Sequence, residues 1–534
     1  MRQGSMWGEA VRKSFASGAV ILTAAGLAAR MLGFVYRVYL SNLIGAEGMG
    51  LYELVIPVYT AVVLTITSGI TIAVSKMVAE QNARSNPANT GRVTVCAIWL
   101  AAGAGMLVSF VISLNAGVFA EKVLGDGRTL GALMILAPCL PGVVAASALK
   151  GYFYGMRRVV PTAVSQIAEQ AVKFLILVLA AGAILEKGPG YACTVAVFAT
   201  AAGEILNMLI LLAVFSFRKK RAEGRSFSPK SGRRSPRLAV IKALLRVAVP
   251  ISANRLVVSS LTAAEFILIP VMLASGGLDE KSSMEIFGRL TGMALPLVMF
   301  PSIVTNSIAT TLVPALSESA ALKRYRALNR QISKSIQITF ILGIVFMSLF
   351  ICFSEEIGSL IYRQEKIGDL LFMLSFSCIF IYLQQTLTGV LNGLGKQGIL
   401  LRNTVIGSII RIAVICVLLP VFGIKAYIIG LTVSLLLTEC MDLIEINKMT
   451  GLVIDLREWI VKPALAGVLM IVAGRYIYHF FEIFSFGARL TTLLSVAVDV
   501  MFAVVLLMLV GVFELRELLS MAGLDNMMKT GKKM

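Results

Sequence analysis

Runs of about twenty apolar residues, separated by short polar breaks, recur along nearly the whole chain. A helix of this length crosses the hydrocarbon core of a bilayer, and a bilayer leaves few alternatives to helices. With 57% hydrophobic and 15% charged residues, the chain is predicted to be an all-α integral membrane protein. We expect about fourteen transmembrane helices, centred near residues 28, 63, 103, 140, 172, 204, 257, 300, 341, 380, 410, 435, 467 and 499.

The formal net charge of +20 follows the expected topology. If the N-terminus is cytoplasmic, the inner loops and tails hold roughly 34 Lys and Arg residues and the outer loops roughly 10. An even number of spans places both termini in the cytoplasm. The positive charge therefore orients the chain in the membrane, and we expect membrane lipids rather than nucleic acid as partners.

Few residues are suited to catalysis or metal binding. The seven cysteines lie within apolar runs, and the only histidine is His479, so neither a zinc site nor a Ser-His-Asp triad is indicated. A membrane glycosyltransferase would need a substantial outer loop with carboxylates, whereas the outer loops here are short; Glu355 and Glu356 are its best candidates. We therefore predict a transporter with no catalytic residue and no metal site.

One polar insertion interrupts the spans. The stretch RKKRAEGRSFSPKSGRRSPR, Arg218 to Arg237, is basic and rich in Ser and Pro, which predicts a disordered cytoplasmic linker that anchors the topology or attracts anionic headgroups. It divides the chain into an N-terminal six-helix bundle, a linker, a C-terminal six-helix bundle, and two additional helices with a tail: residues 1–217, 218–240, 241–450 and 451–534.

The two predicted bundles match each other without a gap when the chain is shifted by 238 residues. This shift superposes glycines and charged residues over about 120 positions, which indicates a duplication. The matched pairs include Gly50 with Gly288, Gly151 with Gly389, Gly155 with Gly393, and Lys173 with Arg411. Six helices is an even number, so the halves share one orientation. We expect a pseudo-two-fold axis along the membrane normal and a cavity between the halves, as in transporters.

Basic residues within the spans are the strongest candidates for binding a substrate, because a charge in the bilayer normally faces protein or a watery cavity. Arg30 and Arg37 lie seven residues apart and share one helix face. Asn254 and Arg255 occupy the span that opens the second half, as the first two open the first. The predicted substrate-binding residues are Arg30, Arg37, Lys173, Asn254, Arg255 and Arg411.

Acidic residues within the spans are predicted to be counter-ions or coupling carboxylates, namely Glu53, Glu169 and Glu265. Glu169 stands four residues before Lys173, so the two could neutralise each other along one helix. Glu265 is either a structural counter-ion or a carboxylate that binds a coupling cation, Na⁺ or H⁺. Arg37, near the outer end of its span, could instead extend to the lipid headgroups.

Guanidinium groups facing a cavity imply an anionic ligand, and their forked donors suit phosphate or pyrophosphate. Charge alone does not name this ligand.

Three segments of the sequence resemble a known family. They are AARMLGFVYRVYLSNLIGAEGMGLYELVIPVY from Ala28, GRLTGMALPLVMFPSIVTNSIATTLVPALSES from Gly288, and LTGVLNGLGK from Leu387. They are similar to sporulation members of the polysaccharide exporter family, within the superfamily of lipid II flippases and multidrug extruders. The resemblance implies two six-helix bundles, often with two extra helices, and movement of an undecaprenyl-pyrophosphate-linked saccharide to the outer leaflet.

The resemblance carries over to one stretch of the first helix. Arg30 to Gly33 match the R-x-L-G of the lipid II flippases, whose arginine serves a cationic cavity. Arg37 lies one residue later than the second arginine of that pattern. No basic residue follows Pro57 until Lys76, although the family has an arginine there, so pyrophosphate binding is expected to differ in detail.

The resemblance implies a lipid-linked saccharide as substrate, lipid II for spore cortex peptidoglycan, with cell-wall or sporulation proteins as further partners. It places the protein in a bacterial cytoplasmic membrane or a forespore membrane. GLGKQG at Gly393 lacks the features of a phosphate-binding loop, so no nucleotide cofactor is expected, and a Na⁺ or H⁺ gradient would supply energy. A cation-coupled multidrug extruder of the same fold and a non-transporting sporulation scaffold are the alternatives.

Overall fold

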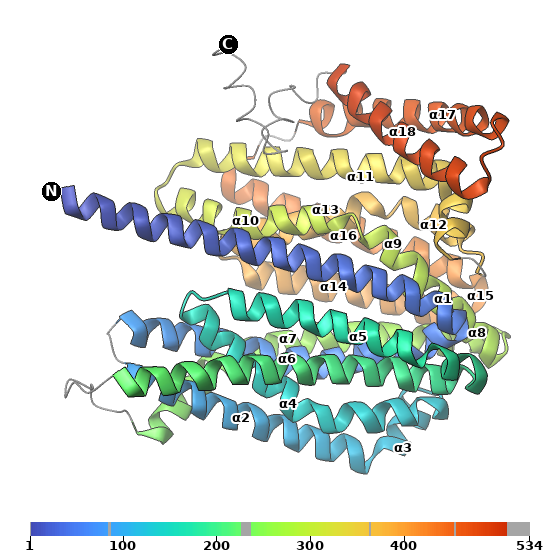
Figure 1. Cartoon of the computed structure of the whole chain (residues 1–534). Coiled ribbons are helices and arrows are strands. Elements are labelled where there is room, and N and C mark those ends of the chain that lie inside the picture. Colours follow the sequence, from blue (N-terminus) through green and yellow to red (C-terminus); the bar gives the residue numbers. More distant parts are fainter. Residues whose placement is uncertain (1, 84–86, 226–235, 363–364, 453–454, 510–534) are drawn as a thin grey trace. The chain divides into compact units, whose positions relative to one another are not determined.

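The computed structural model describes residues 2–83, 87–225, 236–362, 365–452 and 455–509 (Figure 1). Every regular element in these ranges is helical, which confirms the predicted all-α class. Many large apolar side chains are exposed, among them Trp99, Leu107 and Leu179. Apolar surface of this extent suits a protein whose outer helices face lipid rather than water.

Eleven of the described helices are long and apolar enough to cross a membrane, or up to thirteen if each of two bent pairs forms one span. The bent pairs are Glu280–Met299 with Ser302–Ala321, at 58°, and Gly368–Ser375 with Cys378–Gly393, at 53°. The first candidate, Gly26–Ala83, has 58 residues, far more than one crossing needs. It bends at Gly45, where φ is 69°, a backbone angle that glycine adopts readily. The count of fourteen stays a prediction.

The chain divides into two compact units. The first comprises residues 1–292 and 412–424, and the second comprises residues 293–411 and 425–534. The helices of the first unit are α1 (Arg2–Ala83), α2 (Pro87–Leu114), α3 (Ala116–Val118), α4 (Leu130–Gly155), α5 (Val160–Lys187), α6 (Pro189–Arg225), α7 (Arg237–Ser275), α8 (Glu280–Phe287) and α15 (Leu419–Phe422), with short π and 3-10 turns at Phe119–Val123, Gly127–Thr129 and Gly288–Ala294.

The second unit ends with two helices that have no counterpart in the sequence repeat, and they pack on α11. Its helices are α9 (Leu295–Met299), α10 (Ser302–Ala321), α11 (Tyr325–Ile361), α12 (Gly368–Ser375), α13 (Cys378–Gly393), α14 (Gln397–Val417, to Arg411), α16 (Ile424–Thr450), α17 (Lys462–Ile483) and α18 (Ala488–Leu509), with a π turn at Arg457–Val461.

The compact units do not follow the boundaries drawn from the repeat. We expected α7 to open the second bundle, but it packs on α1 in the first unit. A Cβ atom at Gly69 of α1 would lie 2.3 Å from the carbonyl oxygen of Ala248 in α7, so the two backbones are in close contact. Residues 226–235 of the predicted linker lie outside the described residues, and α6 and α7 extend into its two ends. The bundle boundaries stay a prediction.

The repeat does recur in the helix contacts. A Cβ at Gly151 of α4 would lie 2.7 Å from the Thr71 carbonyl oxygen of α1, and a Cβ at Gly389 of α13 would lie 2.7 Å from the Ala309 Cα of α10. Both partners are separated by the same 238 positions. The next turn repeats the contact, between Gly155 and Ser75 and between Gly393 and Val313. The duplication thus places glycine at the same close approach in each unit, while the symmetry axis stays a prediction.

Candidate functional site

The first predicted arginine cluster contains a buried ion pair. Arg37 precedes the Gly45 bend of α1 and Glu53 follows it, and the bend allows Arg37 Nη2 to pair with Glu53 Oε1. Arg37 also donates to the carbonyl oxygens of Thr291 at 2.9 Å and Gly292 at 3.3 Å. Glu53 is buried. Arg37 therefore contacts protein groups here, not the headgroup region that the alternative interpretation gave it, and its role toward a substrate stays a prediction.

A second buried network joins α5 and α6. Lys173 Nζ lies 2.6 Å from Glu169 Oε1, which confirms the pairing expected from their four-residue spacing. Asn207 of α6 donates to the other oxygen of Glu169 at 2.6 Å. Tyr59 of α1 donates to Glu204 of α6 at 3.0 Å. Three helices thus contribute charged or polar groups to the interior of the first unit, and both Lys173 and Asn207 are buried.

Glu204 was not among the predicted site residues, although the repeat held a signal for it. The shift of 238 residues places Glu204 on Asp442, just as it places Lys173 on Arg411. Asp442 of α16 is buried and accepts a hydrogen bond from Asn403 of α14 at 2.6 Å. Each half therefore carries a basic residue on its fifth helix and an acidic residue on its sixth.

Arg411 has different partners from its counterpart Lys173. Its guanidinium donates to the hydroxyl oxygens of Ser408 at 2.9 Å and Ser434 at 3.3 Å. The position four residues earlier is Gly407, and a Cβ there would lie 3.5 Å from Arg411 Nη1. The second half thus has a glycine beside the guanidinium where the first half has Glu169, and hydroxyl groups take over the role of acceptor.

The remaining predicted residues separate by exposure. Arg30 on α1 and Asn254 and Arg255 on α7 are exposed, whereas Glu265 on α7 is buried. All four belong to the first unit, and α1 packs on α7. Exposed guanidinium groups can meet a ligand without disrupting the protein interior, so Arg30 and Arg255 are the stronger candidates for substrate contact.

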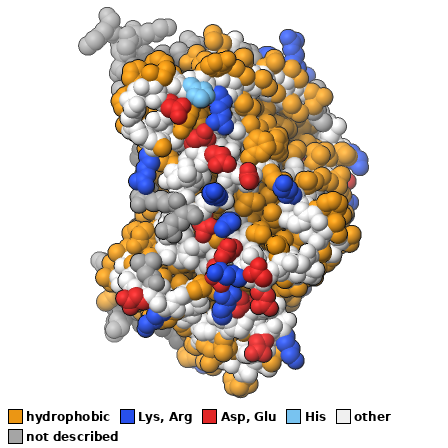
Figure 2. Space-filling model, turned by 90° about the vertical axis from the view of Figure 1, so that its right-hand side faces the viewer, with side chains coloured by type: hydrophobic (Ala, Val, Ile, Leu, Met, Phe, Trp, Pro, Cys, Tyr) orange, Lys and Arg blue, Asp and Glu red, His pale blue; other side chains and the backbone are white. Residues whose placement is uncertain are grey.

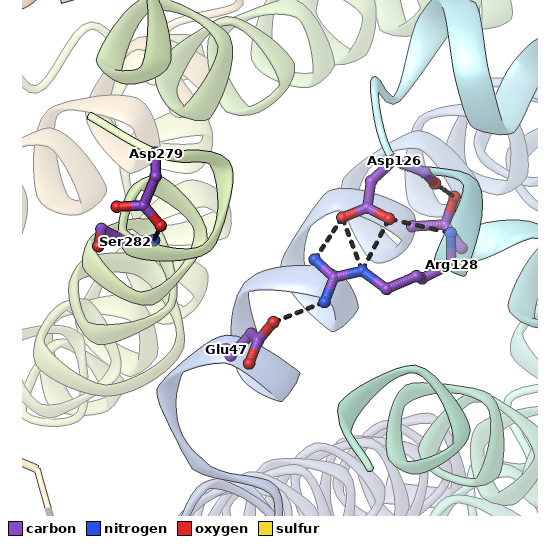
Figure 3. A network of polar contacts seen from close by, with 6 residues as sticks. Glu47, Asp126, Arg128, Asp279 and Ser282 are labelled. Carbon is purple, nitrogen blue, oxygen red and sulfur yellow. Dashed lines mark hydrogen bonds and ion pairs between the residues drawn. The ribbon is translucent and has the colours of Figure 1, made fainter. Parts of the chain in front are cut away.

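Charged residues also gather at one end of the helices. Figure 2 shows a face on which acidic and basic side chains occur together, with apolar side chains on its flanks. In the first unit, Arg128 bridges Asp126 and Glu47, with its Nη2 at 2.7 Å from Asp126 Oδ2 and its Nη1 at 2.5 Å from Glu47 Oε1 (Figure 3). Glu47 directly follows the Gly45 bend, so this network ties the bend to the loop before α4.

Asp279 caps the N-terminus of α8, and its carboxylate accepts a hydrogen bond from the Ser282 backbone N–H at 3.2 Å (Figure 3). Hydrogen bonds from the Ser282 side chain and backbone hold the pKa of Asp279 below its usual value. This contact stabilises the start of a short helix and needs no substrate to explain it.

Two further features limit what the described part of the chain can bind. Within the described ranges, no group of three or more His, Cys, Asp or Glu side chains is arranged to hold a metal ion. An open groove of about 450 Å³ runs between α4 and α6 and is lined by apolar side chains, including Ile135, Phe198, Ile205 and Leu209. A groove of this kind can accept hydrocarbon but offers no recognition of a charged headgroup.

The sequence matches two family models, each over more than half of the chain. The model described as polysaccharide biosynthesis protein matches residues 15–320, and the model described as lipid II flippase MurJ matches residues 172–498. The chain belongs to the family of polysaccharide exporters and lipid II flippases. The two matched ranges overlap and together include the Lys173 network and all predicted site residues.

Proteins of Bacillus subtilis (strain 168) are among its relatives. The chain is 28% identical to stage V sporulation protein B over 481 residues, which is 89% of this chain and 91% of the relative. It is 26% identical to the lipid II flippase MurJ over 414 residues, 74% of this chain and 75% of the relative. These matches agree with the resemblance seen in the three sequence segments.

Solved structures show the same fold at low sequence identity. A lipid II flippase MurJ in an inward closed conformation matches with a TM-score of 0.66 and 11% identity, over 91% of this chain and 99% of that one. An inward-facing multidrug resistance transporter of the MATE family matches with a TM-score of 0.64 and 13% identity, over 79% and 94%. The chain is thus a multi-pass membrane protein with the fold of these transporters.

Proposed function

We propose that this protein is a flippase that moves an undecaprenyl-pyrophosphate-linked saccharide from the inner to the outer leaflet of the cytoplasmic membrane. The observation that carries the proposal is the match to the lipid II flippase family over residues 172–498. Lipid II for spore cortex peptidoglycan is the proposed substrate, because a relative with 91% of its length aligned is a sporulation protein. A forespore membrane, cytoplasmic termini and cell-wall or sporulation partners belong to the same proposal.

The charges of the first unit support an anionic substrate. Glu53 and Glu169 are engaged by Arg37 and Lys173, so these two acids do not offset the exposed guanidinium of Arg255. A pyrophosphate group presents several oxygens that planar guanidinium forks bind in pairs. In this proposal Arg30 and Arg255 grip the pyrophosphate, and Asn254, Lys173 and Arg411 complete the binding surface.

Transport would proceed by alternating access, in which the bundles rock around the bound headgroup while the polyprenyl tail stays in lipid. No sequence motif for nucleotide binding occurs, so a Na⁺ or H⁺ gradient, the membrane potential or removal of the product would drive net movement. A coupling cation would then bind at carboxylates such as Glu265.

A cation-coupled multidrug extruder is the competing function, because MATE transporters share the fold. Their similarity, at 13% identity, extends to the fold alone. Such an extruder would need acidic groups facing cationic drugs, whereas the exposed charges among the predicted site residues are basic. A non-transporting scaffold for a sporulation complex is the second competitor, and it would show no translocation.

Translocation by variants in reconstituted vesicles tests the proposed binding residues. Loss of one charge-assisted contact to a phosphate costs about 1.5–3 kcal/mol, which is roughly a 10- to 100-fold loss of transport efficiency for Arg30→Ala or Arg255→Ala. Arg30→Lys should retain part of the activity, because it keeps the charge but not the fork. Arg489→Ala is the matched control, since Arg489 is exposed at the start of α18. Unchanged flipping by both alanine variants would contradict the assignment.

A further inference from the structure

The two C-terminal helices enclose a fully buried carboxylate. Asp499 lies near the middle of α18, roughly 15 Å from either end of the helix, and it is 0% exposed. The helix packs with α17 against α11, where Ile341, Met470 and Leu506 belong to an apolar core. A charge at this depth is costly, and such residues normally have a partner or a function.

Asp499 has no partner within the described part of the chain. Neither of its carboxylate oxygens makes a hydrogen bond there, and the hydroxyl oxygens of Ser495 on α18 and Ser348 on α11 are also buried without one. Serine and threonine in membrane helices normally bond to the carbonyl one turn earlier, as Thr492 does to Ala488 at 2.8 Å. Four oxygens thus remain unsatisfied where three helices meet, although buried polar groups are almost always paired.

The third helix leaves room for these oxygens. Gly467 and Gly474 of α17 lie seven residues apart and therefore share a face. A Cβ at Gly474 would lie 3.3 Å from Asp499 Oδ1, and a Cβ at Gly467 would lie 2.7 Å from Ser348 Oγ. Larger side chains at either position would crowd the unsatisfied oxygens, so α17 contributes bare backbone to the site.

The charged groups on the neighbouring helices do not neutralise Asp499. Arg475 of α17 pairs with Glu356 of α11 at 2.7 Å. The thiol of Cys352, one turn from Ser348 on α11, donates to the Ile471 carbonyl oxygen at 3.6 Å. The nearby cation is thus engaged by its own carboxylate, and a counter-charge for Asp499 has to come from outside the chain.

We infer that Asp499, Ser495 and Ser348 form a binding site for a single sodium ion. Hard cations take oxygen ligands, and a monovalent ion balances one carboxylate without leaving a surplus charge in the bilayer. A proton would satisfy only one carboxylate oxygen, whereas a sodium ion can engage several oxygens at once. Because these atoms are buried, the ion can enter and leave only when α17 or α18 moves away from α11. Occupancy is therefore linked to the position of the appended helices.

Sodium binding to the purified full-length protein tests this site directly. Equilibrium binding of radioactive Na⁺ and the midpoint of thermal unfolding would be measured in NaCl and in choline chloride at equal ionic strength. We expect one bound ion per chain and a higher midpoint in NaCl for the wild type and for the control Glu482→Gln, which removes an exposed carboxylate from α17. Asp499→Asn should lose both effects, and Ser495→Ala should bind sodium about tenfold or more weakly.

Two results would overturn the inference. One is equal stability in the two salts with no sodium bound. The other is sodium binding that Asp499→Asn and Ser495→Ala leave unchanged. An infrared signal from a protonated Asp499 without sodium binding would assign the site to a proton instead. If Asp499→Asn does not fold, Ser495→Ala and Ser348→Ala decide the outcome. The measurement needs no lipid-linked substrate, so it succeeds or fails independently of the proposed transport function.

Discussion

The Lys173–Glu169 pair provides a quantitative test of how the first unit holds its buried charges. In Lys173→Met the side chain keeps its apolar length beside Gly203, where a Cβ would lie only 2.8 Å from Lys173 Cγ. It loses the ammonium that lies 2.6 Å from Glu169, in a pair whose side chains are 10% and 13% exposed. Removing one partner of a buried ion pair costs about 3–5 kcal/mol.

We expect the lower end of this range for Lys173→Met, about 3 kcal/mol, because Asn207 still donates to Glu169. This loss corresponds to a roughly 100-fold change in the unfolding equilibrium. The double variant Glu169→Gln with Lys173→Met removes both charges, so it should recover more than half of the loss, and the two effects should not add.

Unfolding can be followed with a thiol-reactive fluorophore, because the native fold buries Cys193, Cys352 and Cys378. Lys462→Met is the matched control, since Lys462 pairs with Glu458 at the same four-residue spacing but at the surface, with side chains 23% and 33% exposed. It should change stability by less than about 1 kcal/mol. A Lys173→Met protein as stable as the wild type, or a double variant less stable than both single variants, would refute the reasoning.

Two further predictions concern the packing and the outer network. Gly389→Ala should destabilise the second unit by about 1–3 kcal/mol because its new methyl group meets the Ala309 Cα at 2.7 Å. In Gly398→Ala, where the position is open, stability should be nearly unchanged; equal effects in the two would contradict the close approach. Glu47→Gln should cost less than about 1 kcal/mol, since Arg128 is 39% exposed, and a larger loss in the same unfolding assay would show that the bend depends on this pair.

Sequence periodicity predicted the features that depend on spacing along one helix. The apolar runs gave the all-α membrane class, and the four-residue spacing of Glu169 and Lys173 gave their ion pair. The constant shift of 238 residues anticipated that Gly151 and Gly389 occupy equivalent helix contacts. These predictions succeed because helix geometry fixes which side chains face the same way.

Features that depend on how separate helices fold back could not be predicted in the same way. Arg37 and Glu53 are sixteen residues apart and meet only because Gly45 bends α1 between them. The packing of α7 on α1 also depends on tertiary contacts that a repeat does not specify. The partnerless state of Asp499 is visible only when every neighbour of its carboxylate is known.

Direct translocation by the wild-type protein tests the central claim, that this chain moves a pyrophosphate-linked lipid saccharide. Purified protein would be reconstituted into vesicles, and protein-dependent movement of lipid II, other polyprenyl-linked sugars and a cationic dye would be compared under the same ion gradients. We predict translocation of lipid II, with little movement of the dye. Movement of the dye alone would support the extruder, and movement of none of them would contradict transport.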